Sequence, residues 1–159
     1  VLMIHPARAE LVEARRAQPI LRQAQDERGL ERVGQVLRFA GYAALFGVRD
    51  AGGDVILPGA FAASLVQAPG PLPLLWEHRP RHRIGVVERI GEDARGLRVV
   101  ARLDPASRAA ALLRAGETRG LSFGYRARDY RMEGGTRILQ AIDLFEVSLV
   151  AHPLQHGAR

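Results

Sequence analysis

Two long runs of β-strand character lie next to each other near the end of the sequence, and they constrain its fold most. Residues 121–132 (LSFGYRARDYRM) and 136–150 (TRILQAIDLFEVSLV) alternate apolar and polar side chains over most of their length, a pattern typical of half-buried strands. The turn Glu133-Gly134-Gly135 joins them, and glycine suits the positive φ angles of tight hairpin turns. The pattern therefore predicts a β-rich domain built around a long hairpin.

The preceding sequence predicts shorter strands and two helices. The expected strands cover residues 36–47, 72–78, 84–93 and 96–104. The expected helices cover residues 59–68 and a segment that begins at Asp104, as N-cap, and stops at Gly116. Strands and helices do not alternate as in βαβ units. We therefore expect an α+β, β-rich fold: a closed, mostly antiparallel β-barrel with flanking helices.

Residues 1–33 differ in composition from the rest of the chain. They are rich in Arg, Glu, Gln and Ala, contain no aromatic residue, and have prolines at positions 6 and 19 that would interrupt a helix. Such a segment offers little apolar surface to a core. We expect a poorly ordered N-terminal extension over 1–33, followed by one domain over 34–159.

Composition excludes several classes of site. The chain has no cysteine, which rules out a disulfide, a thiolate nucleophile and a zinc-thiolate centre. The formal net charge is +6, but aromatic residues are 6% of the sequence, and this argues against the stacking surfaces that single-stranded nucleic acid requires. No apolar stretch approaches the roughly 20 residues of a membrane span. We expect a cytoplasmic protein that does not enter a membrane.

Serine is the candidate nucleophile, and the sequence offers Ser64, Ser107, Ser122 and Ser148. Ser64 and Ser107 lie in predicted helices, whereas the other two lie on strands that hold a side chain rigidly. Alternation places Ser122 on the face opposite Leu121 and Phe123, beside a glycine that leaves room for a substrate backbone. A serine on a strand most often has no special role, so Ser122 needs a base nearby to count as a nucleophile.

His78 is the candidate base. It ends the predicted strand LPLLWEH and shares a face with Leu72, Leu74 and Trp76. His82 follows at a spacing that a zinc pair could use, but no third ligand is evident. A lone histidine at a strand end most often has no catalytic role.

Glu146 is the candidate third member of a triad. It interrupts an apolar strand, where an unpaired carboxylate would be costly, so a buried partner is expected. That partner could be an arginine in a structural ion pair, or a histidine that the carboxylate holds in one tautomer. Asp143 and His152 are rivals for the same role. Alternation predicts that one face of this strand is core, formed by Phe145, Val147 and Leu149.

Five blocks of the sequence, in this order and spacing, carry a resemblance to a known family. They are GYAALFG with GDVILPGAF, LPLLWEH with IGVVERI, GLRVVARL, RGLSFGY and LFEVSLVAHP. Together they resemble the HK97-type prohead maturation proteases, over about residues 35–158. The version found in gene transfer agents, which are phage-like particles, is particularly similar.

The resemblance implies a fold, a mechanism and partners. The fold would be similar to that of herpesvirus assembly proteases, a β-barrel surrounded by helices. His78 matches the family's base, Ser122 its nucleophile and Glu146 its orienting acid. Because herpesvirus relatives use a second histidine as third member, His152 stays a candidate. No metal or cofactor is needed.

The resemblance also implies what the protein acts on. The expected substrates are the major capsid protein with its scaffold segment and the protease itself, cut inside assembling heads in the host cytoplasm, and a homodimer is conceivable by analogy with herpesvirus relatives. The alternative function is a catalytically inactive capsid-assembly module with the same fold. A basic nucleic-acid-binding domain ranks last, because the arginines are spread through strands and loops alike.

Overall fold

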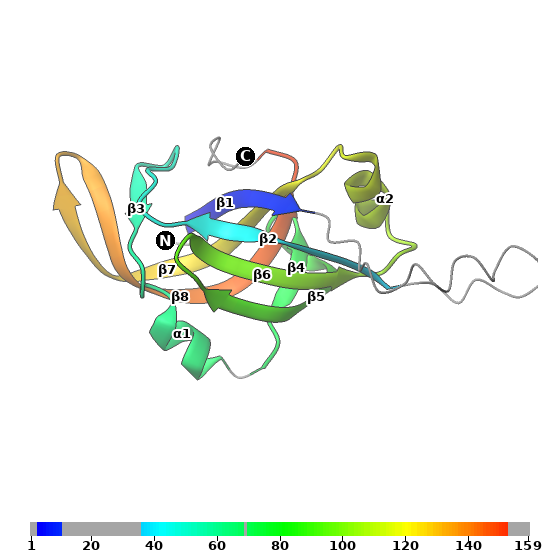
Figure 1. Ribbon diagram of the computed structural model, residues 1–159, viewed down its shortest axis with the longest axis horizontal. Helices are drawn as coiled ribbons and strands as arrows, with labels where there is room; N and C mark the ends of the chain where they lie inside the picture. The colour runs from blue at the N-terminus through cyan, green and yellow to red at the C-terminus, as the bar shows by residue number, and fades with distance from the viewer. Residues whose placement is uncertain (1–2, 11–35, 69, 153–159) are drawn as a thin grey trace, which may run out of the picture.

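The structure, a computed structural model, describes residues 3–10, 36–68 and 70–152. Over these residues, eight strands form one sheet with two short helices beside it (Figure 1). In chain order the elements are β1 (Met3–Glu10), β2 (Leu37–Leu45), β3 (Asp54–Ile56), α1 (Ala62–Gln67), β4 (Pro73–Trp76), β5 (Arg79–Glu92), β6 (Gly96–Leu103), α2 (Arg108–Ala115), β7 (Gly120–Glu133) and β8 (Thr136–Val150). The strand order in the sheet is β3-β8-β4-β5-β6-β2-β1-β7, and β7 also pairs with β8.

The long hairpin expected from the sequence is β7 and β8. The two strands pair in antiparallel register from Gly120 opposite Val150 to Glu133 opposite Thr136. Gly134 and Gly135 have φ angles of 51° and 79° and form the two-residue turn between them, because only left-handed residues match the twist of such a hairpin. In Figure 1 the turn end of the hairpin (orange) extends away from the rest of the sheet. The prediction of a long hairpin near the end of the sequence is confirmed.

The closed, mostly antiparallel barrel that we expected is wrong. The sheet is mixed, because β3 and β4 both run parallel to β8 and share its second edge, at residues 137–139 and 147–149 respectively. The strands within 37–150 curl into a half-barrel in which β2 and β7 are not paired to each other. The β-rich α+β class is correct, and the hairpin of β5 and β6 lies where the sequence predicted one.

Strand β1 belongs to the segment predicted as a poorly ordered extension. Its backbone lies between β2 and β7. It pairs antiparallel with β7 from Met3 to Arg8 and with β2 at Ala9 and Glu10. Part of the predicted extension thus takes a place in the sheet. The remaining residues of 1–33 lie outside those that the structure describes, and the domain boundary near residue 33 stays a prediction.

The core lies inside the curl of the sheet, and β7 contributes its aromatic face. Phe123 is fully buried, with its ring 5.2 Å from that of Phe61 in an edge-on arrangement and 5.0 Å from that of Tyr125. Aromatic pairs at such distances favour tilted or edge-on geometry. The alternation of β7 therefore directs Ser122 to the face opposite these rings, as predicted.

A bulge in β8 changes the predicted alternation there. Gly124 pairs with Glu146 and Tyr125 pairs with Leu144, which leaves Phe145 without a partner on β7. Phe145 is 43% exposed, so its prediction as a core residue is wrong, and Leu144 takes the place opposite Tyr125. The Ser64 hydroxyl of α1 accepts a hydrogen bond of 2.8 Å from the Leu144 amide and so ties the helix to this bulge.

Helix α2 begins later than predicted. Its N-cap is Ser107, whose hydroxyl accepts from the Ala110 amide at 3.1 Å. Asp104, the predicted cap, instead accepts from the Ala106 amide at 2.9 Å in the turn before the helix. Both residues are good caps, and Pro105 fits this turn as well as a first helical position. The end is as predicted, since Gly116 caps the helix in the left-handed conformation.

An ion pair anchors β3 near the N-terminal end of β8. Arg137 donates to both oxygens of Asp54, at 2.8 Å and 2.6 Å, and the Tyr125 hydroxyl donates to Asp54 Oδ2 at 2.6 Å. Burial and then this hydrogen bond raise the pKa of Tyr125 well above its usual value. The short strand is thus held by charge-assisted hydrogen bonds as well as by its backbone pairing.

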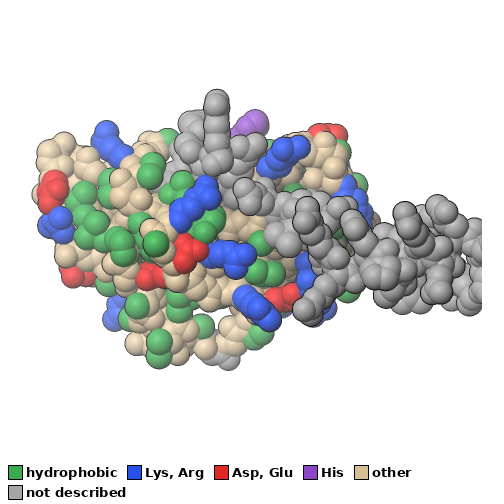
Figure 2. All heavy atoms as spheres, in the orientation of Figure 1, with side chains coloured by type: hydrophobic (Ala, Val, Ile, Leu, Met, Phe, Trp, Pro, Cys, Tyr) green, Lys and Arg blue, Asp and Glu red, His purple; other side chains and the backbone are tan. Residues whose placement is uncertain are grey.

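Basic and acidic side chains are mixed on one face of the molecule. On the face shown in Figure 2, arginine side chains lie among acidic and apolar ones and do not form a single stripe. Among the described residues, no helix is long and apolar enough to cross a membrane.

Candidate active site

The candidate base lies on a strained turn. β4 ends at Trp76, which pairs with Arg79 at the start of β5, so Glu77 and His78 are the central residues of a two-residue hairpin turn. Their φ angles are 48° and 56°, a left-handed conformation that costs a residue with a side chain about 1–2 kcal/mol. The prediction that His78 ends a strand is therefore wrong, and β5 begins at Arg79, in the gap between the predicted strands 72–78 and 84–93. Strain of this kind is concentrated at functional sites.

His78 and Glu146 are hydrogen-bonded. The His78 Nδ1 atom lies 2.7 Å from Glu146 Oε1, and the side chains are 15% and 11% exposed. A carboxylate accepts hydrogen bonds, so it favours the imidazole tautomer with its proton on Nδ1 and leaves the Nε2 lone pair available. The partner that Glu146 was expected to need is thus the histidine rather than an arginine.

Gly124 gives the carboxylate its space. It lies opposite Glu146 in the β7–β8 ladder, and a Cβ built on it would be 2.6 Å from Glu146 Oε1. That distance is too short for two unbonded atoms, so a side chain at this position would displace the carboxylate. The sequence suggested that this glycine leaves room for a substrate, whereas in the structure it leaves room for the acid.

Ser148 contacts both members of the pair. Its hydroxyl donates to Glu146 Oε2 at 2.6 Å and accepts from the His78 backbone amide at 3.2 Å. It is fully buried. Sequence reasoning treated Ser148 as a second candidate nucleophile and missed these contacts. The available signal was its spacing, since residues two apart on a strand share a face.

Ser122 lies beside this group. It pairs with Ser148 across the β7–β8 ladder, so the two side chains are on the same face of the sheet. Its side-chain oxygen is buried, and no hydrogen-bond partner for it is present among the described residues. A buried hydroxyl without a partner costs about 1–3 kcal/mol and calls for an explanation. The structure thus brings all three predicted residues to one face, with Ser122 not hydrogen-bonded to His78.

The two rivals for the role of Glu146, Asp143 and His152, lie away from the His78–Glu146 pair. Asp143 forms surface ion pairs with Arg126 at 2.9 Å and Arg128 at 3.3 Å. His152 is exposed just after β8, and no hydrogen bond or ion pair joins it to another described residue. His82 is exposed on β5, and the described residues contain no group of three or more His, Asp or Glu arranged to hold a metal ion.

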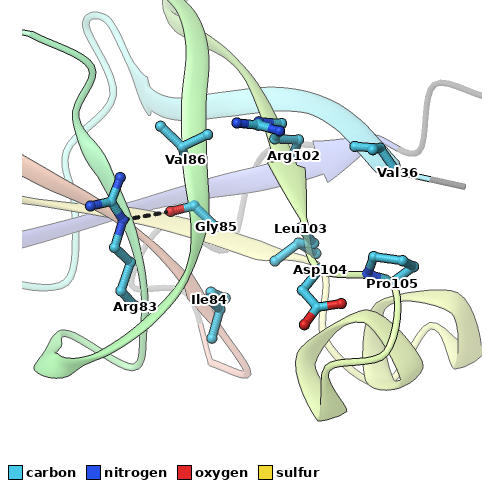
Figure 3. A pocket seen from close by; sticks show the side chains of 9 residues that line it. All are labelled: Val36, Arg83, Ile84, Gly85, Val86, Arg102, Leu103, Asp104 and Pro105. Atoms are coloured by element: carbon cyan, nitrogen blue, oxygen red, sulfur yellow. Dashed lines mark hydrogen bonds between the residues drawn. The ribbon is translucent and has the colours of Figure 1, made fainter. Parts of the chain in front are cut away.

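A shallow groove lies away from this group. It has a volume of about 360 Å³ and is lined mainly by the N-terminal half of β5 and the end of β6 (Figure 3). Arg83 lines it and donates to the Gly85 carbonyl at 3.2 Å. Its lining includes none of Ser122, His78 and Glu146. The groove is therefore separate from the group formed by these three residues.

One curated protein is similar to the chain over most of the chain's length. The prohead protease of Enterobacteria phage HK97 is 33% identical over 128 residues, which cover 76% of this chain and 57% of that protein. The chain thus spans little more than half the length of this relative.

Two solved structures are also similar. The bacteriophage T4 capsid assembly protease, gp21, has the same fold, with a TM-score of 0.66 and 15% identity over 96% of this chain and 98% of its own. The varicella-zoster virus protease matches 51% of this chain and 37% of its own at 27% identity, with a TM-score of 0.41 that is too low to bear on the fold.

The model of one protein family covers most of the sequence. It is the family described as caudovirus prohead serine protease, and it matches residues 21–159. Together with the HK97 relative, this match shows that the chain belongs to the caudovirus prohead serine protease family.

Proposed function

We propose that the chain is a serine endopeptidase that processes capsid and scaffold protein during the maturation of a phage-like head. Family membership supports this function, as does the name of the HK97 relative, a prohead protease. The observation that carries the proposal is the buried His78–Glu146 hydrogen bond next to an unpartnered serine hydroxyl on the neighbouring strand. A serine nucleophile requires a base that a third group orients, and the hydrogen-bonded pair supplies both on the same face as Ser122.

In the proposed mechanism, Ser122 attacks a peptide carbonyl and His78 takes its proton. Glu146 holds the Nδ1–H tautomer and stabilises the imidazolium that forms. The proton then passes from His78 to the departing amine, and a water molecule attacks in the same way to release the acyl group. The free Ser122 hydroxyl is consistent with a site in which the hydrogen bond to His78 tightens when substrate binds.

The proposed substrates are the major capsid protein with its scaffold segment, and the protease itself. Processing would take place inside the assembling head, in the cytoplasm of the bacterial host. A homodimer and an origin in a gene transfer agent are further parts of this proposal. The dispersed arginines on the visible face give no reason to add nucleic acid to these partners.

The test is co-expression with a major capsid protein that carries its scaffold segment, followed by intact-mass analysis. We expect capsid protein to be cut by the wild type and to stay whole with Ser122→Ala. Uncut capsid protein with a folded wild type would instead support the alternative, an inactive assembly module. Co-purification of the two proteins would then measure the binding that this alternative requires.

A further inference from the structure

The Ser148 hydroxyl joins parts of the site that come from three strands. It stands on β8 two residues after Glu146, opposite Ser122 of β7, and it accepts the amide of His78 in the turn that follows β4. Leu75 of β4 is its parallel neighbour in the sheet. One hydroxyl thus links the acid of the pair to the backbone that carries the base.

The hydroxyl satisfies groups that would otherwise lack a partner. The Glu146 carboxylate has one oxygen on His78 Nδ1 and the other on Ser148. Two hydrogen bonds to different oxygens fix the rotation of the carboxylate plane, which a single bond would leave free. The acid is therefore oriented from both sides before any substrate arrives.

The same hydroxyl holds the turn. The His78 amide donates to Ser148 Oγ, and the preceding Glu77 amide donates to the Leu149 carbonyl at 3.1 Å. These bonds fix two residues with positive φ, a conformation that persists only where its surroundings hold it. A carbonyl could accept one of these amides, but only a group that both donates and accepts can serve His78 and Glu146 together.

We infer that Ser148 is a positioning residue, which sets the imidazole of His78 and the carboxylate of Glu146 in register for proton transfer from Ser122. This inference rests on the proposed function. Ser148 acts through His78 and Glu146 and does not itself touch substrate. Its hydroxyl proton is already donated to the carboxylate, which leaves Ser122 as the serine with a free hydroxyl among those at the site.

The experiment compares Ser148→Ala with Ser64→Ala in the full chain. Ser64 is the matched control, because its hydroxyl also accepts a backbone amide, that of Leu144 on β8, but lies outside the His78–Glu146 pair. A fluorophosphonate probe that labels activated serine hydroxyls measures the reactivity of Ser122. Proton NMR of ¹⁵N-histidine protein, with the His78 signal assigned from a His78→Gln variant, reports the Nδ1–H bonded to Glu146.

We expect labelling of Ser122 to slow in Ser148→Ala on the order of 10- to 100-fold, the range that a small misplacement of catalytic groups causes. We also expect the downfield Nδ1–H signal of His78 to move or broaden. Ser64→Ala should keep the wild-type labelling rate and signal. Wild-type values of both in folded Ser148→Ala would overturn the inference.

A second variant covers the case in which Ser148→Ala does not fold. Ser148→Cys replaces the hydroxyl by a slightly larger thiol that is a weak donor and leaves no cavity, so it should fold and show an intermediate rate and a shifted signal. An unchanged rate and signal in this variant would also overturn the inference. The NMR signal needs no activity, so a wild type that fails to label Ser122 refutes the proposed function while the role of Ser148 is still decided.

Discussion

Glu146 occupies the space that a side chain on Gly124 would need, with its Oε1 2.6 Å from the position of a Cβ there. Acid and glycine face each other across the β7–β8 ladder. The glycine is therefore required by the site and not by its own backbone angles.

This relationship predicts the effect of Gly124→Ala. The added methyl should push the carboxylate away from His78, so labelling of Ser122 by the fluorophosphonate probe should slow at least about tenfold. Gly91→Ala is the control, because a Cβ there meets nothing within 4 Å. Equal labelling rates in the two variants would show that Glu146 can move without consequence.

Ser122→Ala should abolish cleavage without lowering stability. The substitution removes a buried hydroxyl that has no partner, so the melting temperature should stay the same or rise. Ser107→Ala provides the contrast, since losing the N-cap of α2 should cost about 1 kcal/mol while cleavage continues. Differential scanning calorimetry and capsid processing are the measurements. Capsid cleavage by Ser122→Ala at the wild-type rate would remove Ser122 from the mechanism.

Glu146→Gln should reduce turnover far more than His152→Ala. An amide can present its NH₂ group to His78 and so favour the wrong tautomer, and in a well-characterised serine protease triad the equivalent change lowers turnover about ten-thousand-fold. His152 is exposed and forms no hydrogen bond or ion pair with His78 or Glu146, so its loss should leave turnover near that of the wild type. Rates of substrate cleavage with parallel melting curves decide between them. An inactive His152→Ala beside an active Glu146→Gln would reverse the assignment.

The raised pKa of Tyr125 predicts that the protein loses stability in strong alkali. Burial and the bond to Asp54 raise its pKa in the folded state, so folding favours the protonated phenol. The contribution is present in full below the unfolded pKa of about 10 and falls as the pH rises toward the folded value. We expect the free energy of unfolding to fall more steeply above about pH 10 in the wild type than in Tyr125→Phe. Urea titrations at several pH values give the free energy of unfolding of both proteins. An equal slope of that free energy against pH in the two proteins would exclude this linkage.

Deletion of residues 1–10 should expose the edges of β2 and β7. Without β1, the backbone groups of Gly120–Tyr125 on that side lose their pairing, so their amides should exchange with solvent faster. Hydrogen exchange read by mass spectrometry tests this, with the β5–β6 hairpin as an internal reference. Unchanged exchange over Gly120–Tyr125 would mean that β1 does not lie on this edge in solution.

The sequence predicted those parts of the fold that depend on local pattern. The β7–β8 hairpin follows from alternation and a Gly-Gly turn, and Gly116 marks the end of α2. The parallel pairing of β4 with β8 was missed, because a four-residue strand gives no sign of a partner far away in the chain. The mostly antiparallel arrangement that we expected was wrong for that reason.

The sequence offered the pairing of Glu146 with a histidine as one of two alternatives, because chemistry limits the partners of a buried carboxylate. A buried carboxylate needs a partner, and His78 is that partner. The turn that carries His78 was missed, since Glu and His are unusual at positive φ and the strand pattern continued through them. The bulge at Phe145 was missed too, because a single inserted residue leaves the apolar count of a strand unchanged.

The position of Glu146 and Ser148 on β8 has a consequence for synthesis of the protein. β8 follows both His78 and Ser122 in the chain, so a ribosome completes the proposed base and nucleophile before it makes the proposed acid. β4 and β7 each take their alignment from β8. Under the proposed mechanism, a nascent chain from which this strand has not yet emerged holds its histidine and serine apart from their acid, and proteolytic competence arrives with the final docking of one strand.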